Sequence, residues 1–427
     1  MQLVVWDKQF QKKVARDFSH TFDKEVAKKV NRILQEVRTR GDLALRRYTR
    51  EFDRVELSLK KLKVDEGDIN RAFEKVEFQF VPLLKQVTDN VKAYYQKELK
   101  KSFEIRGRDG VSLGKRYHPL RRAGIYIPGG TAPLVSTVYM TVIPAKMAGV
   151  KEIVIATPPN RDTGEIDPHI LVVANLLGVT EIYRVGGAQA IGALAFGTRT
   201  IEKVEKIVGP GNPYVAEAKR QVYGFVDVDM VAGPSEVAII ADSGANPDYV
   251  TCDLLAQSEH FGGTAYLITN SKKLAEALRK RVDKGTIILV KSLTEACQAA
   301  NEIAPEHLEI MTEKPKRLLN QIRNAGAVFL GSYSPAVIGD YIAGPSHVLP
   351  TGGTARYFSP LSASTFMKSS QVISYTREAL EKVREPIQKL TEMEGMVLHR
   401  ISLEVRYAEK NENPQEKPSE HELSKKS

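Results

Sequence analysis

The 427-residue sequence has little of what marks membrane-spanning, secreted or disulfide-rich proteins. It contains no apolar run of roughly 18 residues, the length that a membrane-spanning helix needs. The N-terminal stretch MQLVVWDKQFQKKVARDF turns charged early, which is atypical of a signal peptide, so we expect a cytoplasmic protein without a membrane partner. Cysteine occurs only as Cys252 and Cys297, neither in a CxxC motif, and the sequence predicts no disulfide framework.

Clustered positive charge is also missing, although 62 Lys and Arg against 52 Asp and Glu give a net charge of +10. The basic residues are scattered and interleaved with Glu, as in KKLKVDEGDINRAFEKVEF, whereas a nucleic-acid-binding surface gathers them on one face. We therefore expect no nucleic-acid partner. Hydrophobic content of 42% and charged content of 27% are typical of soluble globular proteins, and the length favours more than one domain.

Helix-like segments flank a central region in which strands and helices alternate. Apolar positions recur at helical spacing in residues 24–49, in residues 67–101 and after residue 370. Between them lie short β-branched runs that lead into helix-like stretches. The first series ends in turns with Gly or Pro: GIYIPGG, EIVIATPP, EIYRVGG and KIVGPGN. The second series is SEVAIIADS, TAYLITN, GTIILVK, LEIMTEK and AVFLGSY. This alternation predicts an α/β fold with two Rossmann-like parallel-sheet domains and helical N-terminal and C-terminal appendages.

Changes in the residue pattern along the sequence also predict domain boundaries. The expected parts are an N-terminal arm (1–21), a discontinuous first α/β domain with long N-terminal helices (22–122 and 235–361), an inserted second α/β domain (123–234), a C-terminal helical segment (362–407) and a tail (408–427). The tail is polar and poor in bulky apolar residues, so we expect it to be disordered and His421 within it to have no role.

Glycine-rich turns follow three of the predicted strands. VGGAQAIGALAFG (185–197), VGPGNPYVAEAK (208–219) and GIYIPGGTAPLVSTV place Gly where backbone N–H groups at a helix N-terminus can approach a phosphate. The first two lack a full GxGxxG pattern, and turn glycines are often purely structural. The loops alone therefore leave dinucleotide binding and a structural role both open.

The dipeptide Glu-His occurs in AQSEHFGG and again in APEHLEI. In the first copy, Gln257 and His260 lie three residues apart near the end of a predicted helix, on one face, where they can bind zinc. The alternative is a His that only benefits from the helix dipole. In the second copy, Glu306 and His307 follow a helix that should end at Ala304 and lead into a strand, a position suited to proton transfer or to a plain exposed pair. Spacing alone does not decide between these readings.

Taken together, the motifs resemble the histidinol dehydrogenase family from near the N-terminus to about Arg406. The resemblance rests on GIYIPGGTAPLVSTVYMTVIPAKMAGV, VGGAQAIGALAFGT, VDMVAGPSEVAIIAD, AQSEHFGG, NEIAPEHLEI and GDYIAGPSHVLPTGGTARYFSPLS in this order. It implies the last step of histidine biosynthesis, the oxidation of L-histidinol to L-histidine through bound L-histidinaldehyde. NAD and one Zn²⁺ per subunit are the implied cofactors. The implied assembly is a homodimer in which each C-terminal segment completes the partner's active site.

The same resemblance assigns roles to residues of this sequence. His307 takes the alcohol proton, and Glu306 activates water for the second oxidation. The residues that the family motifs assign to NAD are Tyr126, Gln189 and Asn212; to the metal, Gln257, His260 and His399; and to the substrate, Ser235, His347 and Glu394, together with His307 and the metal ligands.

One position departs from the family pattern. Thr365, before the Phe of LSASTFMKSS, stands where the family usually has an Asp that binds the metal. A site without this carboxylate keeps the full positive charge of Zn²⁺, so we expect weaker metal binding. The departure leaves two alternatives open: a related NAD- and metal-dependent dehydrogenase of another polar alcohol or diol, and a binding protein that has lost the site.

Overall fold

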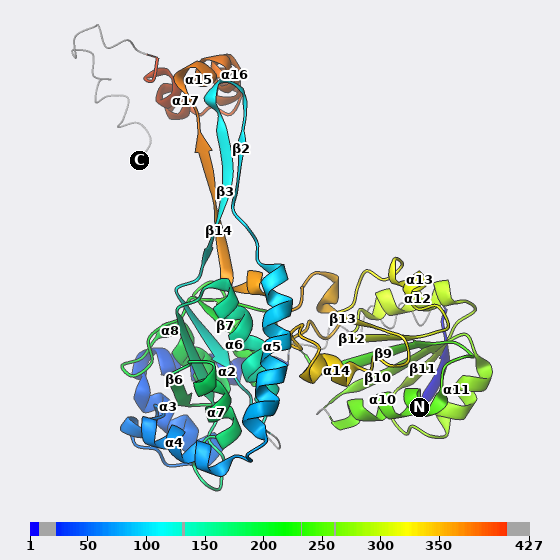
Figure 1. The fold of residues 1–427 in the computed structure, drawn as a ribbon. Helices are drawn as coiled ribbons and strands as arrows, with labels where there is room; N and C mark the ends of the chain where they lie inside the picture. The colour runs from blue at the N-terminus through cyan, green and yellow to red at the C-terminus, as the bar shows by residue number, and fades with distance from the viewer. Residues whose placement is uncertain (8–22, 130–132, 232, 260–261, 408–427) are drawn as a thin grey trace. The chain divides into compact units, whose positions relative to one another are not determined.

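The computed structural model describes residues 1–7, 23–129, 133–231, 233–259 and 262–407. Contacts divide the chain into a main unit, Met1–Lys100 with His118–Lys368, and a C-terminal unit, Lys101–Tyr117 with Ser369–Ser427. The described part of the main unit holds two parallel sheets, each covered by helices (Figure 1). The α/β class and both parallel sheets that the sequence predicts are confirmed. Within the described residues, no helix is long and apolar enough to cross a membrane.

The six-stranded sheet follows the order β1-β11-β10-β9-β12-β13, and every strand pair in it is parallel. Its central strands are buried on both faces, which explains their continuous apolar runs. Helices α10 and α11 pack on one face, and α12 and α13 pack on the other. The bounds are β1 Gln2–Val5, β9 Glu236–Ala241, α10 Pro247–Ala256, β10 Thr264–Thr269, α11 Lys272–Arg279, β11 Thr286–Leu289, α12 Leu293–Ile303, β12 His307–Met311, α13 Lys316–Leu319, β13 Ala327–Leu330 and α14 Ala336–Tyr341.

The five-stranded sheet follows the order β6-β5-β4-β7-β8. From β4 the chain moves outward to β5 and β6, then returns to place β7 and β8 on the other side of β4. The order therefore reverses between β4 and β7, the place where ligands bind in open parallel sheets. The bounds are β4 Arg122–Tyr126, α6 Val135–Ala148, β5 Glu152–Thr157, α7 Pro168–Leu176, β6 Glu181–Arg184, α8 Gly187–Phe196, β7 Lys206–Val208, α9 Pro213–Val222 and β8 Asp227–Val228.

The N-terminal helices cover the five-stranded sheet. Helices α2 (Lys24–Arg40) and α3 (Asp42–Tyr48) share a core with α8, α9 and one face of that sheet, while α4 (Glu66–Lys75) and α5 (Phe80–Glu98) share a core with α6, α7 and the other face. The sequence had instead grouped residues 22–122 with residues 235–361. Periodicity shows that a helix has an apolar face but not which sheet that face covers. The helical pattern over 24–49 is confirmed, and it divides into α2 and α3 because Gly41 adopts φ +51° and ends α2.

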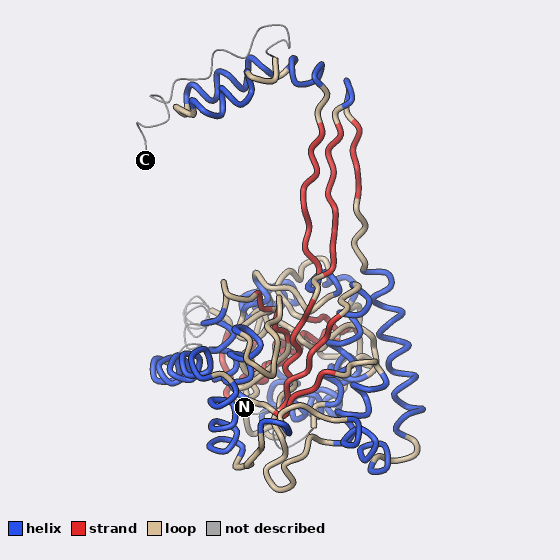
Figure 2. The backbone as a smooth tube through the Cα atoms, turned by 90° about the vertical axis from the view of Figure 1, so that its left-hand side faces the viewer, coloured by secondary structure: helices blue, strands red, loops and turns tan. Residues whose placement is uncertain are grey.

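The C-terminal unit is built from strands as well as helices. Strands β2 (Phe103–Arg106), β3 (Ser112–Pro119) and β14 (Met367–Ser374) form a sheet in the order β14-β3-β2, drawn red in Figure 2. Helices α15 (Arg377–Lys382), α16 (Arg384–Met393) and α17 (Val397–Glu404) follow. The expectation of helical appendages is therefore wrong for the three strands. Their side chains are largely exposed, so no buried face imposed an apolar alternation on the sequence.

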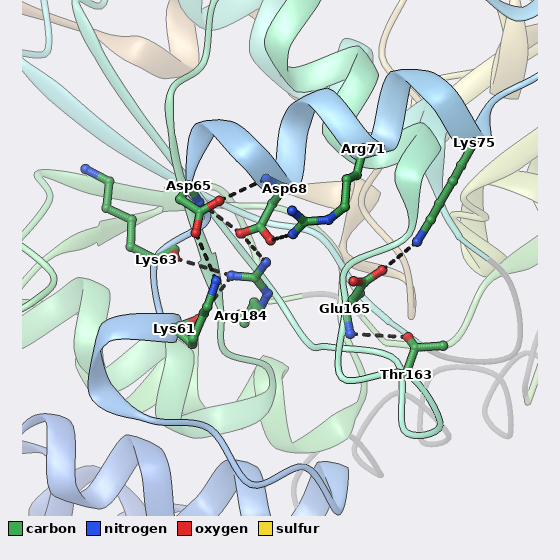
Figure 3. Close-up of polar contacts among 9 residues, drawn as sticks. All are labelled: Lys61, Lys63, Asp65, Asp68, Arg71, Lys75, Thr163, Glu165 and Arg184. Carbon is green, nitrogen blue, oxygen red and sulfur yellow. Dashed lines mark hydrogen bonds and ion pairs between the residues drawn. The ribbon is translucent and has the colours of Figure 1, made fainter.

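A buried ion pair holds the end of β6 against the N-terminal helices (Figure 3). The Arg184 guanidinium lies 2.5 Å from the Asp68 carboxylate and donates to the carbonyl oxygens of Lys61 and Lys63 at 3.0 and 3.3 Å. Both side chains are almost wholly buried, whereas the nearby Lys75–Glu165 pair is exposed. Because Arg184 immediately precedes the glycine turn 185–187, this pair fixes the position of that turn.

We predict that Asp68→Ala lowers the free energy of unfolding by about 3 kcal/mol or more, because it leaves the buried Arg184 charge without its partner. Glu165→Gln, which removes only the exposed pair with Lys75, should cost less than about 1 kcal/mol. Urea unfolding followed by circular dichroism measures both changes. Equal losses in the two variants would contradict the role assigned to the buried pair.

Candidate active site

The carboxyl edge of the five-stranded sheet brings together the three residues that the resemblance assigns to NAD. Tyr126 ends β4, and its hydroxyl accepts a hydrogen bond from the Gly187 N–H at 3.1 Å. Gly209 follows β7 with φ +120°, and a Cβ at this position would lie 2.1 Å from the Tyr126 carbonyl oxygen. Only glycine allows the two strand ends to approach this closely. The edge lies at the reversal of strand order between β4 and β7.

Two helices begin at the same edge. Gln189 lies in the first turn of α8 and is buried, yet neither its amide nitrogen nor its amide oxygen has a hydrogen-bond partner among the described residues. Asn212 caps α9, where its side-chain oxygen accepts from the N–H groups of Tyr214 and Val215 at 3.0 and 3.1 Å. Helix N-termini attract anions, so this edge is suited to a phosphate-bearing ligand. The unpartnered Gln189 amide is suited to a polar group of that ligand.

The second Glu-His pair lies at the amino edge of the six-stranded sheet, where its strands begin. Glu306 precedes β12, His307 is its first residue, and Ser235 and Glu236 stand at the start of the neighbouring β9. The Glu306 carboxylate accepts from the Ser235 hydroxyl at 2.5 Å and from the Glu236 N–H at 3.1 Å. Glu306 and His307 are both buried, so the reading as an exposed charged pair is wrong. Ala304 ends α12 in the left-handed region, as the following Pro predicts.

Burial and neighbouring charges shift the pKa values of the side chains in this cluster. Burial raises the pKa of Glu306, against the lowering effects of the His307 charge and the Ser235 hydroxyl. Burial and the Glu306 charge raise the pKa of Glu236 to about 8. Burial by itself lowers the pKa of His307, but the Glu306 and Asp340 carboxylates outweigh it and raise the value to about 9. The carboxylates therefore hold a proton on the imidazole at neutral pH.

A cleft of about 1030 Å³ opens on His307. Asp340, His347 and Thr365 also line it. The His347 ring lies with Nδ1 3.1 Å from the Asp340 carbonyl oxygen and with Nε2 3.3 Å from the Thr137 hydroxyl of α6. The structure thus brings Ser235, Glu306 and His307 together and adds His347 on the same cleft. A volume of this size accommodates a small polar molecule beside a cofactor.

The residues assigned to the metal are only partly described. Helix α10 ends at Ala256 and a 3₁₀ turn covers Gln257–Glu259, so Gln257 lies just after the predicted helix and not within it. Gln257 is buried and its amide nitrogen has no hydrogen-bond partner among the described residues. His260 lies outside the residues that the structure describes. In the described ranges, no group of three or more His, Cys, Asp or Glu side chains is arranged to hold a metal ion.

Two further assigned residues belong to the C-terminal unit, and Thr365 makes a local contact. Glu394 follows α16 and His399 lies on α17, and both are exposed in the C-terminal unit. The Thr365 hydroxyl accepts from the Ser362 N–H at 3.0 Å in a capping box at the turn Ala363–Phe366. Its oxygen thus caps a turn.

Sequence reasoning missed Glu236 and Asp340. Glu236 directly follows Ser235 in the motif AGPSE, and Asp340 stands in GDYIAGPSH, so both lay inside segments already singled out. Their signal is their position beside His307, which depends on the pairing of β9 with β12 and on the place of α14. Neither the strand pairing nor the place of the helix can be seen in the sequence alone.

Comparison with known proteins identifies the relatives of this chain. The family model described as histidinol dehydrogenase matches residues 17–407. Histidinol dehydrogenase of Clostridium acetobutylicum is 46% identical over 402 residues, covering 90% of this chain and 93% of the relative. That of a Bacillus cereus strain is 47% identical over 416 residues, covering 93% and 96%. The crystal structure of histidinol dehydrogenase from Elizabethkingia anophelis matches with a TM-score of 0.90 and 34% identity over 95% of this chain and 98% of that one. The chain belongs to the histidinol dehydrogenase family of oxidoreductases.

Proposed function

We propose that the chain oxidises L-histidinol to L-histidine with NAD, the last step of histidine biosynthesis. The observation that carries this proposal is the buried Glu306–His307 pair, of which His307 lines the cleft. A carboxylate and an imidazole, one fixed by Ser235 and the other facing the cleft, are the groups that two successive proton removals require. The cytoplasmic location expected from the sequence stays a prediction.

The residues at the carboxyl edge of the five-stranded sheet fit NAD. The buried amide of Gln189 has both a donor and an acceptor to offer, and Gly209 lets the ends of β4 and β7 approach each other closely at this edge. When bound there, NAD accepts the hydride. Tyr126, Gln189 and Asn212 are the residues that we propose to hold it.

The donors assigned to zinc fit a catalytic site with open positions. Gln257, His260 and the partner's His399 would supply three neutral ligands, and catalytic zinc sites commonly have three protein ligands. Gln257 is buried and its amide nitrogen has no hydrogen-bond partner among the described residues, so no described contact of that nitrogen prevents the amide from turning its oxygen toward a metal. A divalent cation bound there orients the substrate and polarises its oxygen. Thr365 is a poor fourth ligand, because its oxygen already accepts the Ser362 N–H.

The protein side of the reaction is proton handling. His307 lines the cleft, and its Nε2 lies 3.4 Å from the Asp340 carboxylate; in its neutral form it would take the proton of the alcohol as the hydride leaves for NAD. Glu306 then removes a proton from water that adds to the aldehyde, and Ser235 keeps its carboxylate oriented. Burial strengthens Glu306 as a base, because a raised pKa increases its affinity for the proton. Ser235, His347 and the partner's Glu394 are the proposed substrate contacts.

A homodimer with shared active sites is part of this proposal. The sheet β14-β3-β2 exposes Phe103, Ile105 and Ile373, and the helices after it expose Met393 and Leu398. A three-stranded sheet needs a covered apolar face for stability, and contiguous exposed apolar side chains mark interaction surfaces. A second copy that covers this surface would bring Glu394 and His399 to the partner's cleft.

A dehydrogenase of another polar alcohol or diol is the second candidate. The capping role of Thr365 favours it, because a carboxylate at this position would contribute to the metal and to the choice of substrate. The retained pair Glu306–His307 favours the first candidate, because a monoalcohol oxidised to an acid requires both bases.

We predict that the purified protein, supplied with Zn²⁺ and NAD, forms two NADH for each L-histidinol consumed, because the alcohol and the aldehyde are each oxidised once. Absorbance of NADH against the remaining substrate measures this ratio. A panel of small diols is the matched comparison. NADH from a diol and none from L-histidinol would reject the first candidate in favour of the second.

Glu306→Gln should slow the aldehyde-to-acid half-reaction by about 10²–10⁴-fold while L-histidinol still binds and is oxidised once, because an amide cannot take a proton from water. Single-turnover formation of NADH from alcohol and from aldehyde separates the halves. Glu302→Gln, an exposed change on α12, is the control and should leave both halves intact. Equal loss of both halves and of binding in the Glu306 variant would contradict its assigned role.

Gln189→Leu should raise the Kd for NAD about tenfold without lowering Tm, because it removes a buried amide that has no partner in the described structure. Gln221→Leu should lower Tm and leave the Kd for NAD unchanged, because the Gln221 amide donates to the Ala27 carbonyl at 2.9 Å and joins α9 to α2. Calorimetric titration with NAD and thermal melts measure the two effects. Loss of Tm with unchanged NAD affinity in the Gln189 variant would make Gln189 structural.

A further inference from the structure

We infer that Lys219 and Asp229 are positioning residues for the proposed NAD site, because their buried ion pair fixes the turn 209–212 between β7 and α9. Lys219 lies on α9, and Asp229 directly follows β8. The inference rests on the proposed function, since Asn212 in this turn is one of the three residues that we propose to hold NAD. A fixed turn determines where Asn212 and the start of α9 lie.

The ion pair binds both backbone groups of Gly209, the first residue of the turn. The Gly209 N–H donates to Asp229 Oδ2 at 2.8 Å, and the Lys219 ammonium donates to the Gly209 carbonyl oxygen at 2.9 Å. The ammonium also pairs directly with Asp229 Oδ1. The same Oδ1 accepts from the Met230 N–H at 2.7 Å, which orients the carboxylate. One pair of side chains therefore determines the orientation of Gly209.

Two glycines make the shape of this turn dependent on contacts from outside it. Gly209 has φ +120°, and a Cβ there would lie 2.1 Å from the Tyr126 carbonyl oxygen. A Cβ at Gly211 would lie 2.4 Å from the Val215 side chain. Both positions therefore require glycine, which has more backbone freedom than any other residue. Ordering a mobile turn on binding would reduce affinity, and the hold on Gly209 removes this cost beforehand.

Burial indicates that this pair contributes geometry more than stability. The side chains of Lys219 and Asp229 are only 2% and 0% exposed. Removing two charges from water costs about as much as their attraction returns, so apolar side chains of similar size would stabilise the fold as well. Apolar side chains, however, cannot bind the N–H and the carbonyl oxygen of Gly209. What the charged pair adds is the fixed orientation of the turn.

A positioning role and an electrostatic role predict different results for the two single variants. Lys219→Met leaves a buried carboxylate near the proposed phosphate site, whereas Asp229→Leu leaves a buried ammonium. Because NAD is an anion, an electrostatic role would weaken NAD binding in the first variant and strengthen it in the second. A positioning role predicts weaker binding in both, since each variant removes one of the two groups that hold Gly209.

The test is calorimetric titration of the full-length chain with NAD, together with thermal melts. Both single variants should raise the Kd for NAD about tenfold. Both should also lower Tm by about 5 °C or more, because each leaves one buried charge without its partner. The double variant Lys219→Met/Asp229→Leu should recover most of the lost Tm, because no buried charge remains. Its Kd should stay raised about tenfold, because Gly209 still lacks both partners.

Two further variants provide the matched controls. Lys206 and Asp227 form a pair between the same two strands, 2.7 Å apart, at the opposite end of β7 from the turn. Asp227 is 50% exposed, so Asp227→Asn should leave both the Kd for NAD and Tm nearly unchanged. Asp229→Asn keeps an oxygen that can accept the Gly209 N–H, so its Kd should lie closer to the native value than that of Asp229→Leu. This comparison also tests the inference if the double variant fails to fold.

Hydrogen–deuterium exchange of peptides that cover the turn 209–212 is the second measurement. Exchange should be slow in the native chain and faster in both single variants and in the double variant, with Asp227→Asn as the unchanged control. In steady-state assays the KM for NAD should rise while the KM for L-histidinol stays the same, because the cluster at β9 and β12 is untouched.

Opposite shifts of the Kd in the two single variants would overturn the inference and leave the proposed function standing. Recovery of NAD affinity together with Tm in the double variant would do the same, because the pair would then serve stability alone. A native chain that binds no NAD would overturn the proposed function and the cofactor role of the pair together.

Discussion

The in-register pairing of β12 with β9 is the constraint on which the proposed chemistry depends. His307 lies opposite Val237 in this ladder, so the residues just before each strand, Glu306 and Ser235, must meet. Parallel strands at the centre of a sheet are buried on both faces, and burial is what raises the pKa of Glu306. A slip of one residue would turn His307 to the other face of the sheet and break the cluster.

The two sheets of the main unit offer opposite edges to ligands. The five-stranded sheet presents its carboxyl edge, where helix N-termini and glycine turns suit phosphate groups. The six-stranded sheet presents the start of its central strands, where the carboxylates of Glu236 and Glu306 lie. An anionic cofactor and a cluster of acidic bases would repel each other at one edge. Their separation onto two sheets lets each keep the electrostatic environment it requires.

The C-terminal unit has only a small buried core of its own. Its sheet leaves both apolar and polar side chains exposed, and its helices contribute few buried residues, such as Ala379 and Leu403. Such a unit gains little stability from its own burial. The metal ligand and the substrate contact assigned to it, His399 and Glu394, are both exposed, so neither has a buried environment within this unit. In the proposed homodimer, both the stability and the function of this unit would depend on association.

By itself, the sequence determined the α/β class, the nine central strands and the end of α12 at Ala304, because burial and backbone chemistry write these features locally as apolar runs and as Gly and Pro turns. The family motifs carried the identities of Tyr126, Gln189 and Glu306. Only the tertiary structure decided that α2 and α3 cover the five-stranded sheet, that β2, β3 and β14 are strands, and that Glu236 and Asp340 lie beside His307. These facts arise from contacts between residues far apart in the chain, and from exposed strands whose side chains no core selects, so no local pattern records them.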